Sequence, residues 1–250
     1  MATPTIVGTG TYDRSAPSAT SKTVSHALAS GTDMVLVFCD YNAGGGAISG
    51  VTYNGVAMTN LAAANVAASP YFARIYYLLA ASLPAAGSSY NVVVSYPATT
   101  GSTNPVVCVV GVQGAKQNAP EAGAGLSIGG TDPVTSATIT TVSASSLIVQ
   151  ALIGTTAATL SSWSNGQTTV NNQSARIVGT KTGPGTPGAQ SMNADLSAAF
   201  TAGASLLVSI EGAATALTLA ASGSELAAAS GTPTYSGVFN AFRGLVLKWP

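Results

Sequence analysis

The sequence predicts an all-β fold: an antiparallel β-sandwich of jelly-roll type, built from two related halves packed as one or two domains. Short runs rich in Val, Ile, Leu, Tyr and Thr alternate with Gly, Ser, Asn and Pro about every ten residues, which is typical of sandwiches and barrels. Asn54-Gly55 lies between two such runs, where an Asn-Gly pair favours a tight hairpin, and Asn165-Gly166 follows a similar run. Several runs also recur in order along the chain.

The predicted strands form three groups. The first covers residues 5–9, 22–27, 34–40, 50–53, 57–62, 73–79, 90–96 and 106–114. The second covers 137–142, 147–153, 160–163, 168–171, 176–181, 192–200 and 206–211, and the third covers 217–220, 235–239 and 243–249. Two Ala-rich pieces, 61–68 and 224–229, are too short to form stable helices alone, so we expect loops there.

An internal repeat links the first two groups. The matching positions are Met34 and Leu147, Asn54 and Asn165, Arg74 and Arg176, and Gly114 and Gly212. The spacing within these pairs falls steadily along the chain, as expected if the second copy keeps its strands and shortens its loops. We therefore predict a first sandwich over residues 1–117, a Gly- and Ala-rich linker over 118–133, and a second sandwich with the C-terminal strands over 134–250.

Charged residues are scarce and balanced. They make up 6% of the chain, and eight Lys and Arg balance eight Asp and Glu, whereas ordinary soluble domains contain roughly 25% charged residues. Nucleic acids and anionic membrane surfaces require clustered Lys and Arg, so neither is an expected partner. A surface with little charge has little self-repulsion and tends to associate. We expect a member of a packed assembly; a secreted protein with a neutral coat is the alternative.

The N-terminal residues contain neither a basic stretch nor a continuous apolar stretch, so the sequence predicts no signal peptide. No apolar run approaches the ~20 residues of a membrane helix. One explanation is a protein that is made in a host cytoplasm and leaves it as part of a particle. An extracellular protein whose signal peptide has been removed is the alternative.

One motif has the form of a catalytic element. Residues 125–129 read Gly-Leu-Ser-Ile-Gly and match the nucleophile elbow, which requires a helix directly after the serine. Pro133 and a β-branched run follow instead, and the only histidine, His26, precedes Ser127. No carboxylate pair or metal-ligand spacing is evident. We expect no enzymatic activity, metal or cofactor. Cys39 and Cys108 each lie in an apolar run, and the sequence leaves open whether they pair.

Three aromatic residues are the candidate ligand contacts. Tyr41 lies beside a triple-glycine loop, and Tyr71 and Phe72 follow Pro70. If their rings are exposed at the ends of the sandwich, they could bind sugars. The alternative is that they cover the ends of the core.

Three segments resemble a module of phage virion proteins and bacterial surface proteins. They are Val-Thr-Tyr-Asn-Gly-Val-Ala-Met at 51–58, Arg-Ile-Tyr-Tyr-Leu at 74–78, and the run from Leu83-Pro84 to Ser95-Tyr96. A later run at 146–149 and a closing run at 244–247 complete the pattern, and the resemblance covers most of residues 5–212. These motifs describe strands and turns, and the resemblance transfers no catalytic residue.

The resemblance implies a jelly-roll-like accessory role in decoration, fibre formation or adhesion. We expect a non-enzymatic structural virion protein of a tailed phage, such as a capsid decoration or head/tail accessory protein. Its partners would be copies of itself and a larger coat or tail protein. A carbohydrate-binding or adhesion module, with a surface glycan as its ligand, is the alternative.

Overall fold

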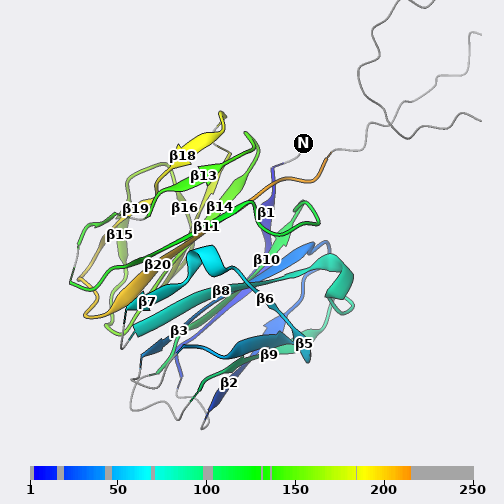
Figure 1. Cartoon of the computed structure of the whole chain (residues 1–250), viewed down its shortest axis with the longest axis horizontal. Helices are drawn as coiled ribbons and strands as arrows, with labels where there is room; N and C mark the ends of the chain where they lie inside the picture. Colours follow the sequence, from blue (N-terminus) through cyan, green and yellow to red (C-terminus); the bar gives the residue numbers. More distant parts are fainter. Residues whose placement is uncertain are drawn as a thin grey trace, which may run out of the picture. The chain divides into compact units, whose positions relative to one another are not determined.

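β-Strands dominate the computed structural model, which describes residues 3–15, 20–42, 47–68, 71–97, 104–130, 132–135, 137–183 and 185–214 (Figure 1). All strand pairs within these ranges are antiparallel, and the helical pieces there are two 3-10 turns, η1 (Ala62–Ala64) and η2 (Ala80–Ser82). The predicted all-β sandwich is confirmed. The predicted strands after residue 214 and the piece at 224–229 lie outside the described residues.

The first half of the chain forms two sheets. The first inner sheet has the order β1 (Thr5–Asp13), β10 (Val107–Gln113), β3 (Met34–Asn42), β8 (Tyr71–Leu79) and β6 (Thr59–Asn60), and β7 (Val66–Ala68) also pairs with β8. The first outer sheet has the order β2 (Ser21–Ala27), β9 (Ser89–Ser95), β4 (Gly50–Tyr53) and β5 (Val56–Ala57).

The second half repeats this plan. The second inner sheet has the order β11 (Ala122–Ser127), β20 (Gly203–Ile210), β14 (Leu147–Gly154), β17 (Arg176–Thr182) and β16 (Thr168–Gln173). The second outer layer contains β12 (Val134–Thr135), β19 (Asn193–Leu196) and β15 (Leu160–Trp163), followed by the pair β13 (Ile139–Thr141) and β18 (Gly188–Gln190).

The layers stack in the order outer, inner, inner, outer (Figure 1). A middle core between the two inner sheets includes Phe38, Val149 and Leu206, and outer cores lie between each inner sheet and its outer partner. Strands β3, β10, β14 and β20 are buried on both faces. This double burial explains why their sequences are near-continuous apolar runs instead of alternating ones.

Strand pairing shows that the halves repeat each other in register. Met34 lies opposite Val112 and Leu79, as Leu147 lies opposite Ile210 and Thr182. One predicted match is wrong by one residue. Counted from these positions, Arg74, opposite Cys39, corresponds to Ile177, opposite Leu152. Arg74 and Arg176 therefore lie on opposite faces of their strands, because successive side chains in a strand alternate.

Two further expectations differ from the structure. The predicted linker at 118–133 contains β11, which pairs with β20 at the edge of the second inner sheet. Asn54-Gly55 does form the expected hairpin, with positive φ at both residues, but at Asn165-Gly166 only the glycine has positive φ. There the chain crosses between layers, because β15 pairs with β19 and β16 pairs with β17.

Candidate functional site

The structure buries two of the three aromatic candidates. Tyr41 is 0% exposed and stacks on Tyr96 with ring centroids 5.1 Å apart, and Tyr71 is 2% exposed in the middle core. Phe72 is half-buried against the first outer core. Tyr41 and Tyr71 therefore belong to the core, which is the alternative that the sequence analysis left open. β3 continues to Asn42 and β8 begins at Tyr71, so these residues pair inside the sheet where the sequence suggested loops.

Tyr71 belongs instead to a buried polar chain that joins the two halves. Its hydroxyl lies 2.7 Å from Oδ2 of Asp40 and 3.0 Å from the carbonyl oxygen of Ile153 in the second half. Oδ1 of Asp40 accepts a hydrogen bond from the Val106 N–H at 2.5 Å. A tyrosine hydroxyl has one proton and cannot donate fully to both oxygens. When Asp40 is ionised, it accepts from the Tyr71 hydroxyl; when it is protonated, it can donate to that hydroxyl, which is then free to donate to Ile153.

The surroundings of Asp40 stabilise its protonated form more than water does. Burial raises its pKa to about 6, although the hydrogen bonds from Val106 and Tyr71 and the positive charges of Lys22 and Arg14 act in the opposite direction. Asp40 is 3% exposed. The same burial, together with the charge of Asp40, raises the pKa of Tyr71 well above its usual range, so this hydroxyl remains protonated.

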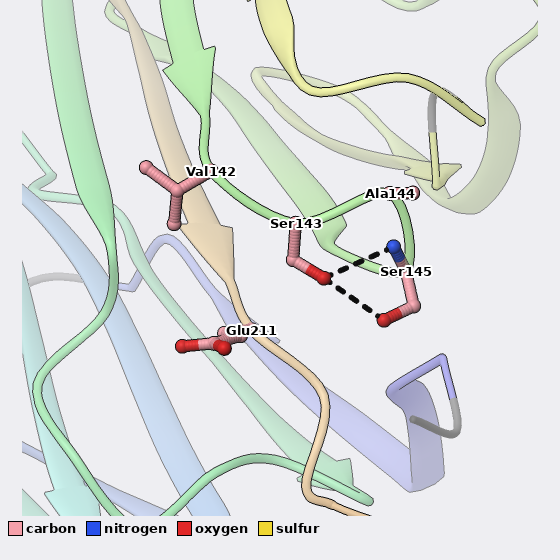
Figure 2. A pocket seen from close by; sticks show the side chains of 5 residues that line it. All are labelled: Val142, Ser143, Ala144, Ser145 and Glu211. Carbon is pink, nitrogen blue, oxygen red and sulfur yellow. Dashed lines mark hydrogen bonds between the residues drawn. The ribbon is translucent and has the colours of Figure 1, made fainter. Parts of the chain in front are cut away.

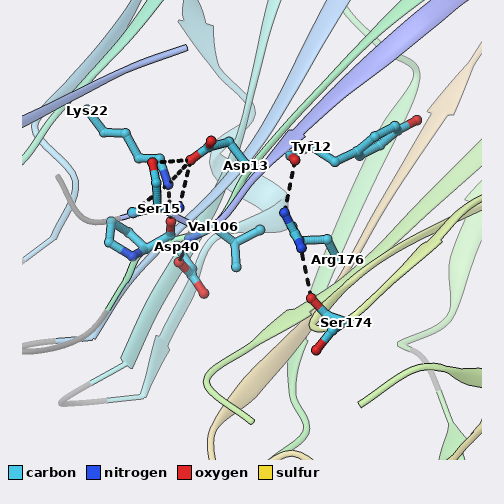
Figure 3. A network of polar contacts seen from close by, with 9 residues as sticks. Tyr12, Asp13, Ser15, Lys22, Asp40, Val106, Ser174 and Arg176 are labelled. Atoms are coloured by element: carbon cyan, nitrogen blue, oxygen red, sulfur yellow. Dashed lines mark hydrogen bonds and ion pairs between the residues drawn. The ribbon is translucent and has the colours of Figure 1, made fainter. Parts of the chain in front are cut away.

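Further charged groups lie around the same junction (Figure 3). The ammonium of Lys22 contacts Asp13 at 2.5 Å and donates to the carbonyl oxygens of Pro105 at 2.6 Å and Ser15 at 3.0 Å. Arg176 of the second half donates to the Tyr12 carbonyl at 3.0 Å, and Arg14 of the first half donates to the Thr155 carbonyl. The two arginines bind backbone carbonyls across the junction, and Lys22 binds groups within the first half, so all three have a structural use.

The remaining catalytic candidates do not form a site. His26 is buried on β2, where Thr11 Oγ1 lies 3.2 Å from Nδ1, and burial lowers its pKa to about 4. Ser127 is exposed at the end of β11, on a strand and not on the strand-to-helix turn that an elbow requires. The two residues belong to different sheets, the first outer and the second inner. The structure therefore does not unite them.

Both cysteines are free and buried. Cys39 faces the first outer core and Cys108 faces the middle core, so their side chains lie on opposite faces of the first inner sheet. Burial raises the pKa of both thiols. Within the described ranges, no group of three or more His, Cys, Asp or Glu side chains could hold a metal ion. No helix in those ranges is long and apolar enough to cross a membrane.

One surface hollow of about 480 Å³ lies between the end of β13 and the start of β14 (Figure 2). Ser143, Ser145 and Glu211 line it. The hydroxyl of Ser143 accepts from the Ser145 N–H at 3.2 Å, and Glu211 pairs with Lys116 at 2.7 Å. These polar groups bond to one another or to near neighbours, so the hollow is the surface of a local turn.

A second hollow of about 560 Å³, here called the Arg74 groove, lies at the open edge of the first sandwich. Its lining includes Gly50, Thr52, Met58, Asn60, Arg74 and Tyr76, from β4, β6, β8 and the residue between β5 and β6. Sequence reasoning missed this site. The signal in the sequence is Arg74 itself, a charged residue within the apolar run of β8, at a position where strand alternation predicts a core side chain.

Comparisons of the chain with protein-family models, with curated proteins and with solved structures find no match.

Proposed function

We propose that this chain is a non-enzymatic structural protein of a tailed phage virion, a capsid decoration or head/tail accessory protein that acts through protein–protein assembly. The observation that supports it best is that, in the described part of the chain, most of the few charged side chains bond to other groups of the same molecule. Its partners would be copies of itself and a larger coat or tail protein.

Several carboxylates outside the junction are bound to backbone N–H groups of the same chain. Asp33 accepts from Gly114 at 2.5 Å, Asp132 from Leu196 at 2.9 Å, and Glu121 from Val142 at 3.1 Å. The rest of the surface therefore consists largely of uncharged side chains. Burying an uncharged surface against a neighbour avoids most of the desolvation cost of burying ions, which favours large protein contacts.

The strand order supports the jelly-roll part of the proposal. The main strands of the first half follow β1-β10-β3-β8 in one sheet and β2-β9-β4-β5 in the other. Each sheet alternates strands from the beginning and the end of the segment, which is how a jelly roll winds two Greek keys around each other. The second half follows the corresponding order, β11-β20-β14-β17. We infer two jelly rolls packed through their inner sheets.

Sedimentation velocity of the purified chain over a range of concentrations, with and without particles from its native source, tests the assembly role. We expect self-association or co-sedimentation that changes little at high salt, because few charges take part. A chain that stays monomeric and binds no particle would contradict the proposal.

Three exposed apolar side chains are the first targets for mutation: Val56, Leu126 and Val142, which are 40%, 40% and 65% exposed. Replacing each by Lys should weaken any contact that buries it, since an ammonium is costly to desolvate. The matched Thr variants control for the loss of the apolar group, and circular dichroism checks that each variant is folded. Association that is unchanged in all three Lys variants would exclude these side chains from the contact.

The carbohydrate-binding alternative keeps one supporting observation. The Arg74 groove is open, and side chains with hydroxyl or amide groups contribute to its lining.

A further inference from the structure

The Arg74 groove is formed where the chain passes from the first outer sheet to the first inner sheet. β5 is the edge strand of one sheet and β6 is the edge strand of the other, with Met58 between them. The two edges leave a gap of about 560 Å³ between β4 and β8. Ligand pockets commonly have volumes of about 300–1,000 Å³, so the groove is large enough for a small ligand.

Arg74 interrupts an otherwise apolar face. Phe72, Tyr76 and Leu78 lie on the same face of β8 and pack against the first outer core. Arg74 is half-buried on that face, and its side chain bonds to the Tyr76 hydroxyl. The ion pairs found among the described residues are Asp13–Lys22 and Lys116–Glu211. The guanidinium therefore keeps donors available beside a groove, in a protein that engages most of its other charges internally.

The second half shows that the fold does not require this opening. By strand register, Tyr76 corresponds to Gly179, which lies opposite Gln150 as Tyr76 lies opposite Val37. A Cβ atom on Gly179 would lie 2.4 Å from the Trp163 ring, so Trp163 of β15 covers this place. Its indole N–H donates to Thr169 at 2.9 Å. In the first half the buried Tyr76 ring occupies this place itself. Arg74, on the same strand face, borders the groove, whereas the second half has the buried Ile177 at the corresponding position.

We propose that the Arg74 groove binds a carboxylated sugar unit of an acidic polysaccharide. The guanidinium would hold the carboxylate through paired, charge-assisted hydrogen bonds. Ser49, Thr52 and Ser95 line the same groove, and their hydroxyl groups would match the hydroxyls of a sugar ring. An acidic peptide could present the same carboxylate, but its acidic side chains lack the hydroxyl groups that would match the serines and the threonine of the lining.

This inference is independent of the assembly role, because it is measured on the isolated full-length chain. Isothermal titration with a uronic-acid oligosaccharide, its methyl-esterified counterpart and an oligoglutamate peptide tests it. We expect binding of the free uronate and at least about tenfold weaker binding of the ester, which lacks the charge. Equal binding of oligoglutamate, or no binding of the uronate, would overturn the proposal.

Matched variants locate the site. Arg74→Gln should weaken uronate binding at least about tenfold, and Arg74→Lys should recover only part of it, because an ammonium lacks the planar fork. Gly50→Leu fills the groove from β4, where an added Cβ atom meets nothing within 4 Å, and it should block binding without removing a charge. Lys181→Gln removes a charge from another strand and should leave binding unchanged. Equal loss in Lys181→Gln would indicate non-specific charge attraction and overturn the site, as would full binding in Gly50→Leu.

Discussion

Asp40 is the residue at which burial and charge conflict most directly. Its carboxyl group is enclosed between the Val106 N–H and the Tyr71 hydroxyl, and the ordinary carboxyl pKa of 3.8 rises to about 6. The folded chain therefore binds a proton more tightly than the unfolded chain. The stability that this proton provides is fully present below about pH 4 and is lost as the pH rises through about 6.

Asp40→Asn mimics the protonated carboxyl, since its amide can donate to Tyr71 while its oxygen accepts from Val106. We expect the variant to unfold at higher denaturant concentration than the parent at neutral pH. The gain should be up to about 3 kcal/mol, the equivalent of the pKa shift. Urea unfolding from pH 4 to 7 should show the parent losing stability relative to the variant. A variant less stable than the parent at neutral pH would mean that Lys22 and Arg14 require the ionised form.

Some residue-scale features could be predicted from the sequence and others could not. His26 is the ordinary strand residue that its neighbours indicate, because local alternation decides its environment. For Tyr71 the sequence left open whether the ring is exposed or covers the core, and no local pattern indicates that its hydroxyl contacts Ile153 in the other half. Such a contact joins residues far apart in the chain, and only packing of the two halves determines it.

At the scale of elements, β11 shows how glycines decide a contact between the halves. A Cβ atom on Gly125 would lie 2.3 Å from the Ala64 carbonyl oxygen, and one on Gly123 would lie 2.6 Å from Leu61. The absence of side chains lets β11 approach η1 closely. The Gly-x-Ser-x-Gly resemblance at this strand therefore has a packing explanation for Gly125.

Gly125→Ala should destabilise the chain by about 1–3 kcal/mol, because the backbone of η1 must move to admit the methyl group. Ser127→Ala, at the exposed end of the same strand, should change stability by less than about 0.5 kcal/mol. Urea midpoints of the two variants make the comparison. Equal midpoints would show that β11 moves away from η1 at no cost.

Strand prediction succeeded where burial leaves a strong pattern. The doubly buried strands β3, β10, β14 and β20 are recognisable as apolar runs. β7, β11, β12 and β18 were missed, since they are short or contain Ala and Gly in place of β-branched residues. The strand pairing on either side of Asn165-Gly166 could not be predicted either, because a turn sequence does not show which strands its neighbours pair with.

For the whole molecule, the middle core is the decisive feature. It contains side chains from both inner sheets, including Leu36 of the first and Leu206 of the second. Unfolding one half would expose the apolar face of the other. The halves should therefore unfold together, although the sequence alone suggests two units joined by a linker.

Leu206→Ala in the middle core and Leu152→Ala in the second outer core remove the same side chain from fully buried positions. Each should cost about 2–5 kcal/mol. If the middle core couples the halves, Leu206→Ala should accelerate hydrogen exchange in β3 and β10 as well as in β14. Exchange that accelerates in the second half alone would show that the halves are independent.

Because the two inner sheets conceal each other, sequence change is least constrained in the outer layers. The two halves already differ there: Trp163 covers Gly179 in the second half, and Arg74 borders a groove in the first. If the halves arose by duplication of one unit, both could keep the same inner sheets while their outer layers diverged. A neighbour that recognises one end would have no reason to bind the other, which gives a single chain a built-in polarity.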